Sequence, residues 1–177
     1  MASSAAKRYA EAVFEVAQEK GALDAWQHDL SLLNDLMSNP QAAAFFGNPN
    51  VTPAHKRQIV DEVLANAQPE ARNLAHLLIE RHRMGLVPDI YQDYSDAHLA
   101  SLGIAVADVT TAEPLGKEEQ ELVRAQLGRI VGKEIRLRLH TDPAIIGGVI
   151  ARVGDMLIDG SVVNQLRRLR TRLAAAT

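Results

Sequence analysis

Residues 142–161 read DPAIIGGVIARVGDMLIDGS, and this stretch decides the fold of the C-terminal part of the chain. Four glycines interrupt an otherwise nearly continuous apolar run. Glycine weakens the interior of a strand unless a turn, a bulge or a close approach of two backbones requires it. We therefore expect strands over residues 145–153 and 156–158, joined by a tight turn at Gly154-Asp155.

The sequence on both sides of this stretch alternates between strand and helix patterns. Residues 134–140 place apolar side chains on one side and Arg, Arg and His on the other, as in a half-buried strand. Residues 104–111 are rich in Val, Thr and Ile and predict a further strand. Residues 117–131 predict a helix with an acidic first turn, and Ser161 is expected to cap a last helix. The apolar stripe of that last helix consists of Val162, Leu166, Leu169 and Leu173. Together these elements predict a small α+β unit.

The first hundred residues show a helical period that is broken at short intervals. Asn39-Pro40 and Thr52-Pro53 each combine an N-cap residue with a proline at the first helical position. Gly21 and Gly85 are expected to end helices. The pattern predicts six helices packed as an all-α bundle. Residues expected to face inward include Tyr9, Val13, Leu74, Leu77, Leu78, Tyr94 and Leu102.

Charge and composition separate two parts of the chain and exclude several classes of protein. Residues 1–105, which we take as the six-helix domain, carry 8 Lys and Arg against 13 Asp and Glu. Residues 106–177, which we take as the α+β domain, carry 11 against 9, and the overall charge of −3 gives no reason to expect nucleic acid. The lack of cysteine excludes disulfides and thiolate chemistry. No apolar run reaches the ~20 residues that span a bilayer, and no signal core opens the chain, so we expect a bacterial cytoplasmic location.

Three patterns could be mistaken for catalytic or ligand sites. Residues 128–134 superficially resemble a phosphate loop, but three residues instead of four separate the glycines, and Glu134 stands where Ser or Thr is needed. We interpret them as the end of a helix followed by a strand. Asp142, Asp155 and Asp159 lie beside Pro or Gly, where Asp commonly forms turns, and the six histidines are scattered. The sequence therefore favours a binding or structural protein over an enzyme, with no cofactor and no metal.

Two of the expected helices carry features that suit a protein partner. The last helix contains Arg167, Arg168, Arg170 and Arg172. These arginines are consistent with a solvated face, a nucleic-acid site or a basic face for an acidic partner, and the lack of an aromatic platform disfavours nucleic acid. The helix around Tyr9 is rich in alanine, which permits close approach of another helix. Its apolar stripe is either core alone or also one wall of a groove for an amphipathic helix.

These features resemble the delta subunit of F-type ATP synthases, a family called the oligomycin-sensitivity-conferring protein in mitochondria. The most specific match runs from Gly147 to Ser161. Its turn and signature positions are Gly147, Gly148, Gly154, Asp155, Asp159 and Gly160. Residues 8–12 (Arg-Tyr-Ala-Glu-Ala) are similar to the first-helix motif of the family, and residues 111–115 to its interdomain strand. Residues 83–85 resemble the end of its fifth helix, although the order of Gly and Arg differs.

The resemblance implies a non-enzymatic stator element of the ATP synthase. In the family, the N-terminal bundle binds the N-terminal helices of the alpha subunits of the catalytic head. The C-terminal domain binds the b subunits of the peripheral stalk. The resemblance therefore implies one copy per complex at the cytoplasmic face of the bacterial inner membrane, without nucleic acid and without direct membrane insertion. The subunit would help the stalk resist rotary torque during proton-driven ATP synthesis.

The resemblance also indicates which residues would contact these partners. An alpha-subunit helix docks between the first and fifth helices of the family. The matching positions here are Tyr9, Ala12, Val13, Leu74, Leu77 and Leu78. For the b subunits only a region is indicated, Gly160 to Leu173, within which Leu166 and Leu169 are expected to be core. An RNA-binding regulator, and an enzyme whose site is assembled from distant residues, remain as alternatives.

Overall fold

The computed structural model describes residues 4–175, except for the side chains of residues 169, 170 and 172–175. The chain divides into two compact units, Met1–His98 and Leu99–Thr177. The division falls inside a helix and earlier than residue 105, where the sequence pattern changes from helix to strand.

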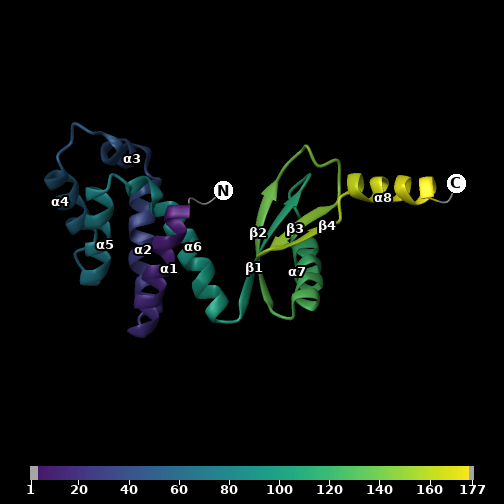
Figure 1. The fold of residues 1–177 in the computed structure, drawn as a ribbon, viewed down its shortest axis with the longest axis horizontal. Coiled ribbons are helices and arrows are strands. Elements are labelled where there is room, and N and C mark those ends of the chain that lie inside the picture. The colour runs from purple at the N-terminus through teal and green to yellow at the C-terminus, as the bar shows by residue number, and fades with distance from the viewer. Residues whose placement is uncertain (1–3, 176–177) are drawn as a thin grey trace. The chain divides into compact units, whose positions relative to one another are not determined.

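The first unit is helical (Figure 1). Its elements are α1 (Ser4–Glu19), α2 (Leu23–Ser38), α3 (Pro40–Gly47), α4 (Pro53–Val63), α5 (Pro69–Glu80), the 3₁₀ turn η1 (Met84–Leu86) and α6 (Val87–Ser101). Two of the expected caps are present. The Asn39 side chain accepts from the backbone N–H of Gln41 at 2.8 Å, and the Thr52 hydroxyl accepts from that of His55 at 3.5 Å. Each cap precedes a proline, whose missing N–H would have no helical partner in any case.

The end of α5 differs from the sequence prediction. The helix stops at Glu80 instead of continuing to Gly85. The backbone N–H of Arg83 donates to the carbonyl of Leu78 at 2.8 Å, and that of His82 donates to Ile79 at 3.1 Å. This is the hydrogen-bond pattern of a Schellman motif, with His82 at φ 53° in the left-handed position that glycine usually takes. The prediction that Gly85 ends this helix was wrong. The helix ends earlier, because the hydrogen bonds of the motif close it with His82, and no glycine is needed there.

The core of the helical unit is built from Leu, Ile, Val and Ala around Trp26 and Tyr94, which are both almost fully buried. The hydroxyl of Tyr94 donates to the carbonyl of Leu23 at 2.9 Å, which joins α6 to the start of α2. Two expected inward residues are exposed: Leu77 retains 39% of its accessible surface and Leu102 retains 63%. Leu102 lies beyond the last residue of α6, so the helical period no longer directs it toward the core.

The second unit is a four-stranded sheet with helices α7 (Lys117–Val131) and α8 (Val162–Ala175). Its strands are β1 (Ile104–Thr111), β2 (Glu134–Thr141), β3 (Val149–Val153) and β4 (Met156–Asp159), in the spatial order β2-β1-β3-β4. β1 pairs parallel with β2 across the α7 connection and antiparallel with β3, and β3 pairs antiparallel with β4. The helices and strands predicted at 104–111, 117–131 and 134–140 are confirmed within one residue.

The strand expected from residue 145 begins only at Val149, so that prediction was wrong for residues 145–148. The Asp142 carboxylate accepts from the backbone N–H of Ala144 at 2.9 Å, and the Asp142 carbonyl accepts from that of Ile145 at 3.1 Å. These local hydrogen bonds form a turn at residues 142–145, so the extended strand begins only after it. Ile146 is left 78% exposed, although it belongs to the apolar run.

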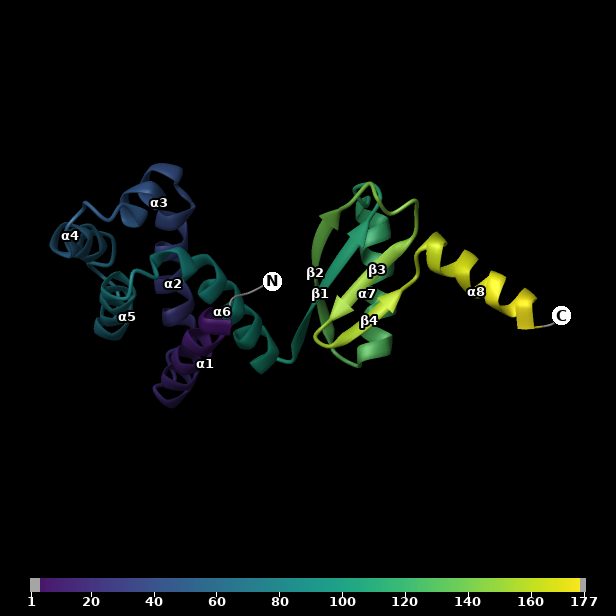
Figure 2. The same ribbon diagram turned by 45° about the horizontal axis from the view of Figure 1, so that its top comes forward.

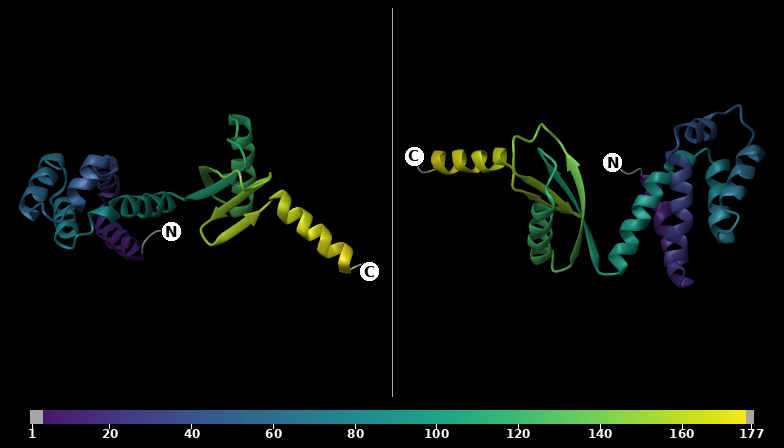
Figure 3. Two further views of the ribbon diagram at one scale, coloured as in Figure 1. Left: turned by 90° about the horizontal axis from the view of Figure 1, so that it is seen from above. Right: turned by 180° about the vertical axis from the view of Figure 1, so that it is seen from behind.

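α7 covers one face of the sheet (Figures 2 and 3). Leu127 from α7 is buried with Ala107, Val109, Ile135 and Ala151 from three strands. Strand side chains alternate between faces, so the neighbours of these residues lie on the face away from α7. There the Asp108 carboxylate lies 3.2 Å from the guanidinium of Arg138 and 3.3 Å from the ring of His140.

Candidate functional site

Two polar contacts hold α1 beside α5. Lys20, just after α1, forms an ion pair with Glu70 in the first turn of α5. Tyr9 in α1 accepts a hydrogen bond at 3.4 Å from Arg83, just after α5. The end of α1 is therefore joined to the start of α5, and the first half of α1 to the end of α5, as in an antiparallel pair. We call the strip between these two contacts the α1–α5 seam.

The helical period places further residues along this seam. Tyr9, Val13, Val16 and Lys20 follow the spacing i, i+4, i+7, i+11, so they share one flank of α1. Glu70 and Leu77 share one flank of α5 by the same rule. Val16 is 36% exposed and Leu77 is 39% exposed. The seam thus presents two large apolar side chains to solvent, one from each helix, between its polar ends.

The six residues predicted to contact a partner helix are not equally accessible. Ala12 and Leu77 are exposed, and Tyr9 is half-buried. Val13, Leu74 and Leu78 belong to the buried core. Leu77 was predicted to face inward, and that prediction was wrong. Only part of the predicted set can therefore offer surface without a rearrangement of the bundle.

Four residues that define the seam lie outside the predicted contact set: Val16, Lys20, Glu70 and Arg83. Val16 belongs to the same apolar stripe as Tyr9 and Val13, so its spacing could have selected it. The pairing of Lys20 with Glu70 spans fifty positions and has no local pattern.

A hollow of about 370 Å³ lies at the Arg83 end of the seam. It is lined by Ala5 from α1 and by His82, Arg83, Gly85 and Leu86 from the turn and η1 after α5. The Schellman motif at His82 shapes this wall because it reverses the chain immediately after the last turn of α5. Arg83 lines the hollow and also bonds Tyr9 at the end of the seam, so the two features adjoin at this residue.

In the second unit, the glycine-rich stretch joins the sheet to α8. Gly148 has a φ of +88°, and a Cβ there would lie 2.5 Å from the carbonyl oxygen of Gly160. The backbone N–H of Gly160 donates to Val149, and that of Val162 donates to Gly147. The segment before β3 is thereby fastened to the segment after β4. Gly154 and Asp155 form the turn between β3 and β4.

Asp159 and Ser161 organise the start of α8. The Asp159 carboxylate accepts from the backbone N–H of Ser161 at 3.0 Å, and the Ser161 hydroxyl accepts from that of Asn164 at 3.2 Å. The hydrogen bonds from the Ser161 side chain and backbone lower the pKa of Asp159 below its ordinary value. The predicted cap at Ser161 is confirmed.

α8 exposes much of its apolar surface. Val162 is 38% exposed, Val163 is 40% exposed and Leu166 is 60% exposed. The expectation that Leu166 is core was wrong, because no described residue of α8 belongs to the cluster packed around the sheet. The side chains of Leu169, Arg170, Arg172 and Leu173 lie outside the described part of the chain. Arg167 and Arg168 are exposed beside Leu166.

The patterns that resembled ligand sites have structural roles. Residues 128–131 end α7, Gly132 caps it in the left-handed region, and β2 follows from Glu134, as the sequence predicted. Among the side chains that the structure describes within residues 4–175, no group of three or more His, Asp or Glu is placed to hold a metal ion. None of the helices described in that range combines the length and apolar character needed to cross a bilayer.

Comparison with known proteins identifies the family. The profile described as ATP synthase delta (OSCP) subunit matches residues 5–173. The chain belongs to this family. The ATP synthase subunit delta of Dehalococcoides mccartyi (strain ATCC BAA-2266) is 37% identical over 169 residues, covering 96% of this chain and 93% of that protein. The subunit delta of Symbiobacterium thermophilum is 34% identical over 178 residues, covering 99% and 96%.

A solved structure shares the fold. A chain in the cryo-EM structure of the Toxoplasma gondii mitochondrial ATP synthase hexamer superposes with a TM-score of 0.74 and 23% sequence identity. The match covers 97% of this chain and 98% of that chain. As a member of the delta (OSCP) family, the protein is a non-catalytic subunit of the ATP synthase and a component of its peripheral stalk. This membership overrides the alternatives of an RNA-binding regulator and an enzyme.

Proposed function

We propose that the α1–α5 seam receives the N-terminal helix of an alpha subunit of the catalytic head. The observation that carries this proposal is the exposure of Val16 and Leu77 between the Lys20–Glu70 and Tyr9–Arg83 contacts. An amphipathic helix in such a groove buries apolar side chains of both partners, at about 25 cal/mol for each Å² removed from water. Of the six predicted residues, Tyr9, Ala12 and Leu77 offer surface, and with Val16 they form the proposed contact set. Val13, Leu74 and Leu78 pack beneath them in the core and support the seam.

The affinity of this docking would come mainly from apolar burial. The two polar contacts at the ends of the seam are largely exposed, and exposed ion pairs contribute roughly 0–1 kcal/mol. Salt should therefore change the affinity little. In this proposal, the six helices of residues 1–105 act as a rigid cap that holds the groove while the rotor applies torque.

The second proposed contact joins the α+β domain, residues 106–177, to the b subunits of the peripheral stalk. The region from Gly160 to Leu173 begins with three exposed apolar side chains and continues with Arg167 and Arg168. A helix with that surface suits an apolar partner face edged with acidic residues. We place one copy of the subunit in each complex, at the cytoplasmic face of the bacterial inner membrane, linking the head to the stalk.

The docking proposal is tested by calorimetry with the full-length chain and a synthetic peptide of about 20 N-terminal residues of the alpha subunit from the same organism. We expect saturable one-to-one binding that is weakened by Tyr9→Ala and by Leu77→Asp. Leu102→Asp is the matched control, because Leu102 is an exposed leucine that belongs to neither helix of the seam. Equal binding by Leu77→Asp and the wild type would refute the seam as the docking site.

A further inference from the structure

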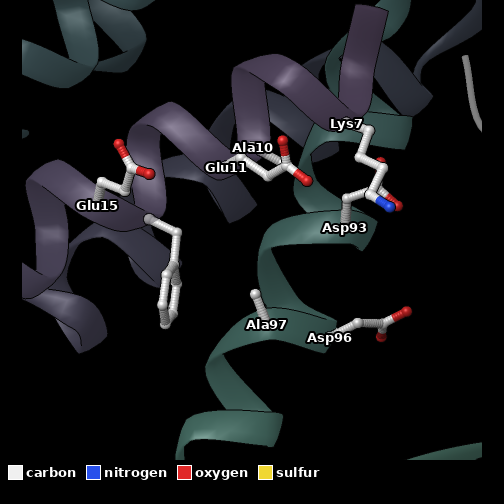
Figure 4. Close-up of a pocket in the computed structure, with 8 residues that line it drawn as sticks. Lys7, Ala10, Glu11, Glu15, Asp93, Asp96 and Ala97 are labelled. Atoms are coloured by element: carbon white, nitrogen blue, oxygen red, sulfur yellow. The ribbon is translucent and has the colours of Figure 1, made fainter. Parts of the chain in front are cut away.

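A second groove lies on the other flank of α1, beside α6 (Figure 4). Lys7, Glu11 and Phe14 follow the spacing i, i+4, i+7 and so lie on one side of α1, away from Val16 and the α1–α5 seam. They line a hollow of about 350 Å³ together with Asp93, Asp96 and Ala97 of α6, which we call the α1–α6 hollow. Its lining also includes Ala10 and Glu15.

The floor of the α1–α6 hollow is apolar and preformed. Ala10 and Ala97 are small, so α1 and α6 leave space between them at this point. The ring of Phe14 packs edge-on against Tyr94, with their centroids 5.9 Å apart and an interplanar angle of 63°. Because Tyr94 is fully buried, this contact fixes Phe14 as a wall of the hollow. An apolar side chain entering the hollow would meet carbon atoms on two helices.

The rim of the hollow is acidic. Four carboxylates surround the apolar floor: Glu11, Glu15, Asp93 and Asp96. Among the residues that the structure describes, Lys7 is the one basic residue in the lining, and its side chain points toward Asp93 (Figure 4). The hollow therefore keeps an excess of negative charge, which attracts a cationic group through the low-dielectric wall formed by Phe14.

The carboxylate of Asp93 lacks part of the hydrogen bonding that would offset its negative charge within the described residues. Its Oδ2 atom is buried and accepts no hydrogen bond from the residues that the structure describes. Burial raises the pKa of Asp93, as do the neighbouring charges of Asp96, Asp89 and Glu11, while Lys7 acts in the opposite direction. A buried carboxylate oxygen without a donor is costly, and a guanidinium or ammonium group is the donor that removes most of that cost.

We infer that the α1–α6 hollow is a docking site for a basic amphipathic helix of a protein partner, which inserts apolar side chains over Phe14 and places Arg or Lys on the acidic rim. Charge complementarity and the apolar floor together select this occupant. A metal ion would gain nothing from the alanine and phenylalanine floor. A helix edged with acidic residues, such as the partner proposed for α8, would be repelled by the acidic rim. The inference is independent of the α1–α5 seam.

The test uses the full-length chain and a designed peptide of about 15 residues with leucine at helical spacing and arginine on both flanks of the stripe. A control peptide carries glutamate in place of arginine. Titration followed by amide chemical shifts should move resonances of α1 and α6 around Phe14 and Ala97. The control peptide should bind at least about tenfold more weakly, because it loses the charge-assisted hydrogen bonds to the rim and its glutamates are repelled by the carboxylates there.

Two variants locate the site. Ala97→Leu should fill the hollow and weaken the arginine peptide by about tenfold or more, whereas Ala100→Leu, an exposed alanine in the same helix, should leave it unchanged. Asp93→Asn should weaken binding without unfolding the chain, because it removes an incompletely compensated charge. Equal affinity for both peptides, or shifts confined to the α1–α5 seam, would overturn the inference. Either result would leave the alpha-subunit proposal intact, because that proposal is tested with a different peptide and with Leu77→Asp.

Discussion

The carboxylate of Asp29, in the middle of α2, accepts a hydrogen bond at 3.0 Å from the backbone N–H of Gln68, the residue that precedes α5. The same oxygen accepts from the Gln68 side-chain amide at 3.3 Å. Asp29 is only 4% exposed, so these bonds form in a largely water-free setting. They fix the start of α5 on α2, and Glu70 lies in the next turn. The position of the α1–α5 seam therefore depends on a contact between α2 and the loop before α5.

Asp29→Ala is expected to destabilise the helical unit by about 2 kcal/mol, because the partly buried N–H of Gln68 loses its acceptor. Asp29→Asn keeps an oxygen acceptor and should cost less. The fluorescence of Trp26, the single tryptophan, reports unfolding of this unit in urea. Asp35→Ala, at an exposed position of the same helix, is the control and should be nearly neutral. Equal stability of Asp29→Ala and Asp35→Ala would mean that the contact does not hold α5.

Adjacent leucines in α5 should separate binding from folding. Leu77 is 39% exposed on the seam and Leu78 is fully buried. Leu77→Ala should weaken the alpha-subunit peptide while changing the free energy of unfolding by no more than about 1 kcal/mol. Leu78→Ala should destabilise the unit by about 3 kcal/mol, because it leaves a cavity in the core. Calorimetry measures peptide binding and urea unfolding measures stability for both variants. A large loss of stability in Leu77→Ala, or a loss of binding only in Leu78→Ala, would contradict the seam geometry.

The sequence predicted most of the elements because their determinants are local. Asn39 and Ser161 cap helices through bonds that reach only two or three residues along the chain. The alternation of apolar and polar side chains in residues 134–140 likewise predicts a strand without information about any distant residue. Residues 145–148 were misread because apolar character was taken as strand, while Asp142 forms a turn that competes with it.

The candidate site was less predictable for a physical reason. The helical period places Leu78 on the inner face of α5 and Leu77 at the edge of that face, where only the position of α1 decides whether the side chain stays exposed. The exposure of Val16 depends in the same way on the position of α5. The Lys20–Glu70 contact that sets this arrangement joins residues far apart in sequence, so no local pattern marks it.

Gly148→Ala should destabilise the sheet unit more than Gly154→Ala. Both positions have positive φ, but a Cβ at Gly148 would also meet the backbone of Gly160 at 2.5 Å, whereas nothing lies within 4 Å at Gly154. We expect a cost of about 1 kcal/mol at Gly154 from backbone strain alone, and at least ~2 kcal/mol at Gly148. All aromatic residues precede residue 95, so amide hydrogen exchange in β3 is the suitable measurement. Similar exchange rates in the two variants would argue against the close approach of Gly148 to Gly160.

His82→Gly should stabilise the helical unit. His82 occupies the left-handed position of the Schellman motif at φ 53°, where a residue with a Cβ pays about 1–2 kcal/mol that glycine avoids. The greater flexibility of glycine in the unfolded chain offsets part of this gain, so the net increase should be below ~1 kcal/mol. Urea unfolding followed by Trp26 measures it. His55→Gly, inside the first turn of α4, is the contrasting substitution and should destabilise.

The start of α8 should loosen in acid because of Asp159. Hydrogen bonds from Ser161 lower the pKa of this carboxyl, with smaller contributions from Arg168 and Arg167. A group whose pKa is lower in the folded state stabilises that state above its unfolded pKa, about 3.9 for Asp, and this contribution is lost as the pH falls through the folded value. Amide exchange at Ser161 and Asn164 should therefore accelerate relative to the rest of the chain below pH ~4. Asp159→Asn should remove the pH dependence, while Asp155→Asn, in the exposed turn of the same hairpin, should retain it. The same acid response in Asp159→Asn as in the wild type would show that another group controls this end of α8.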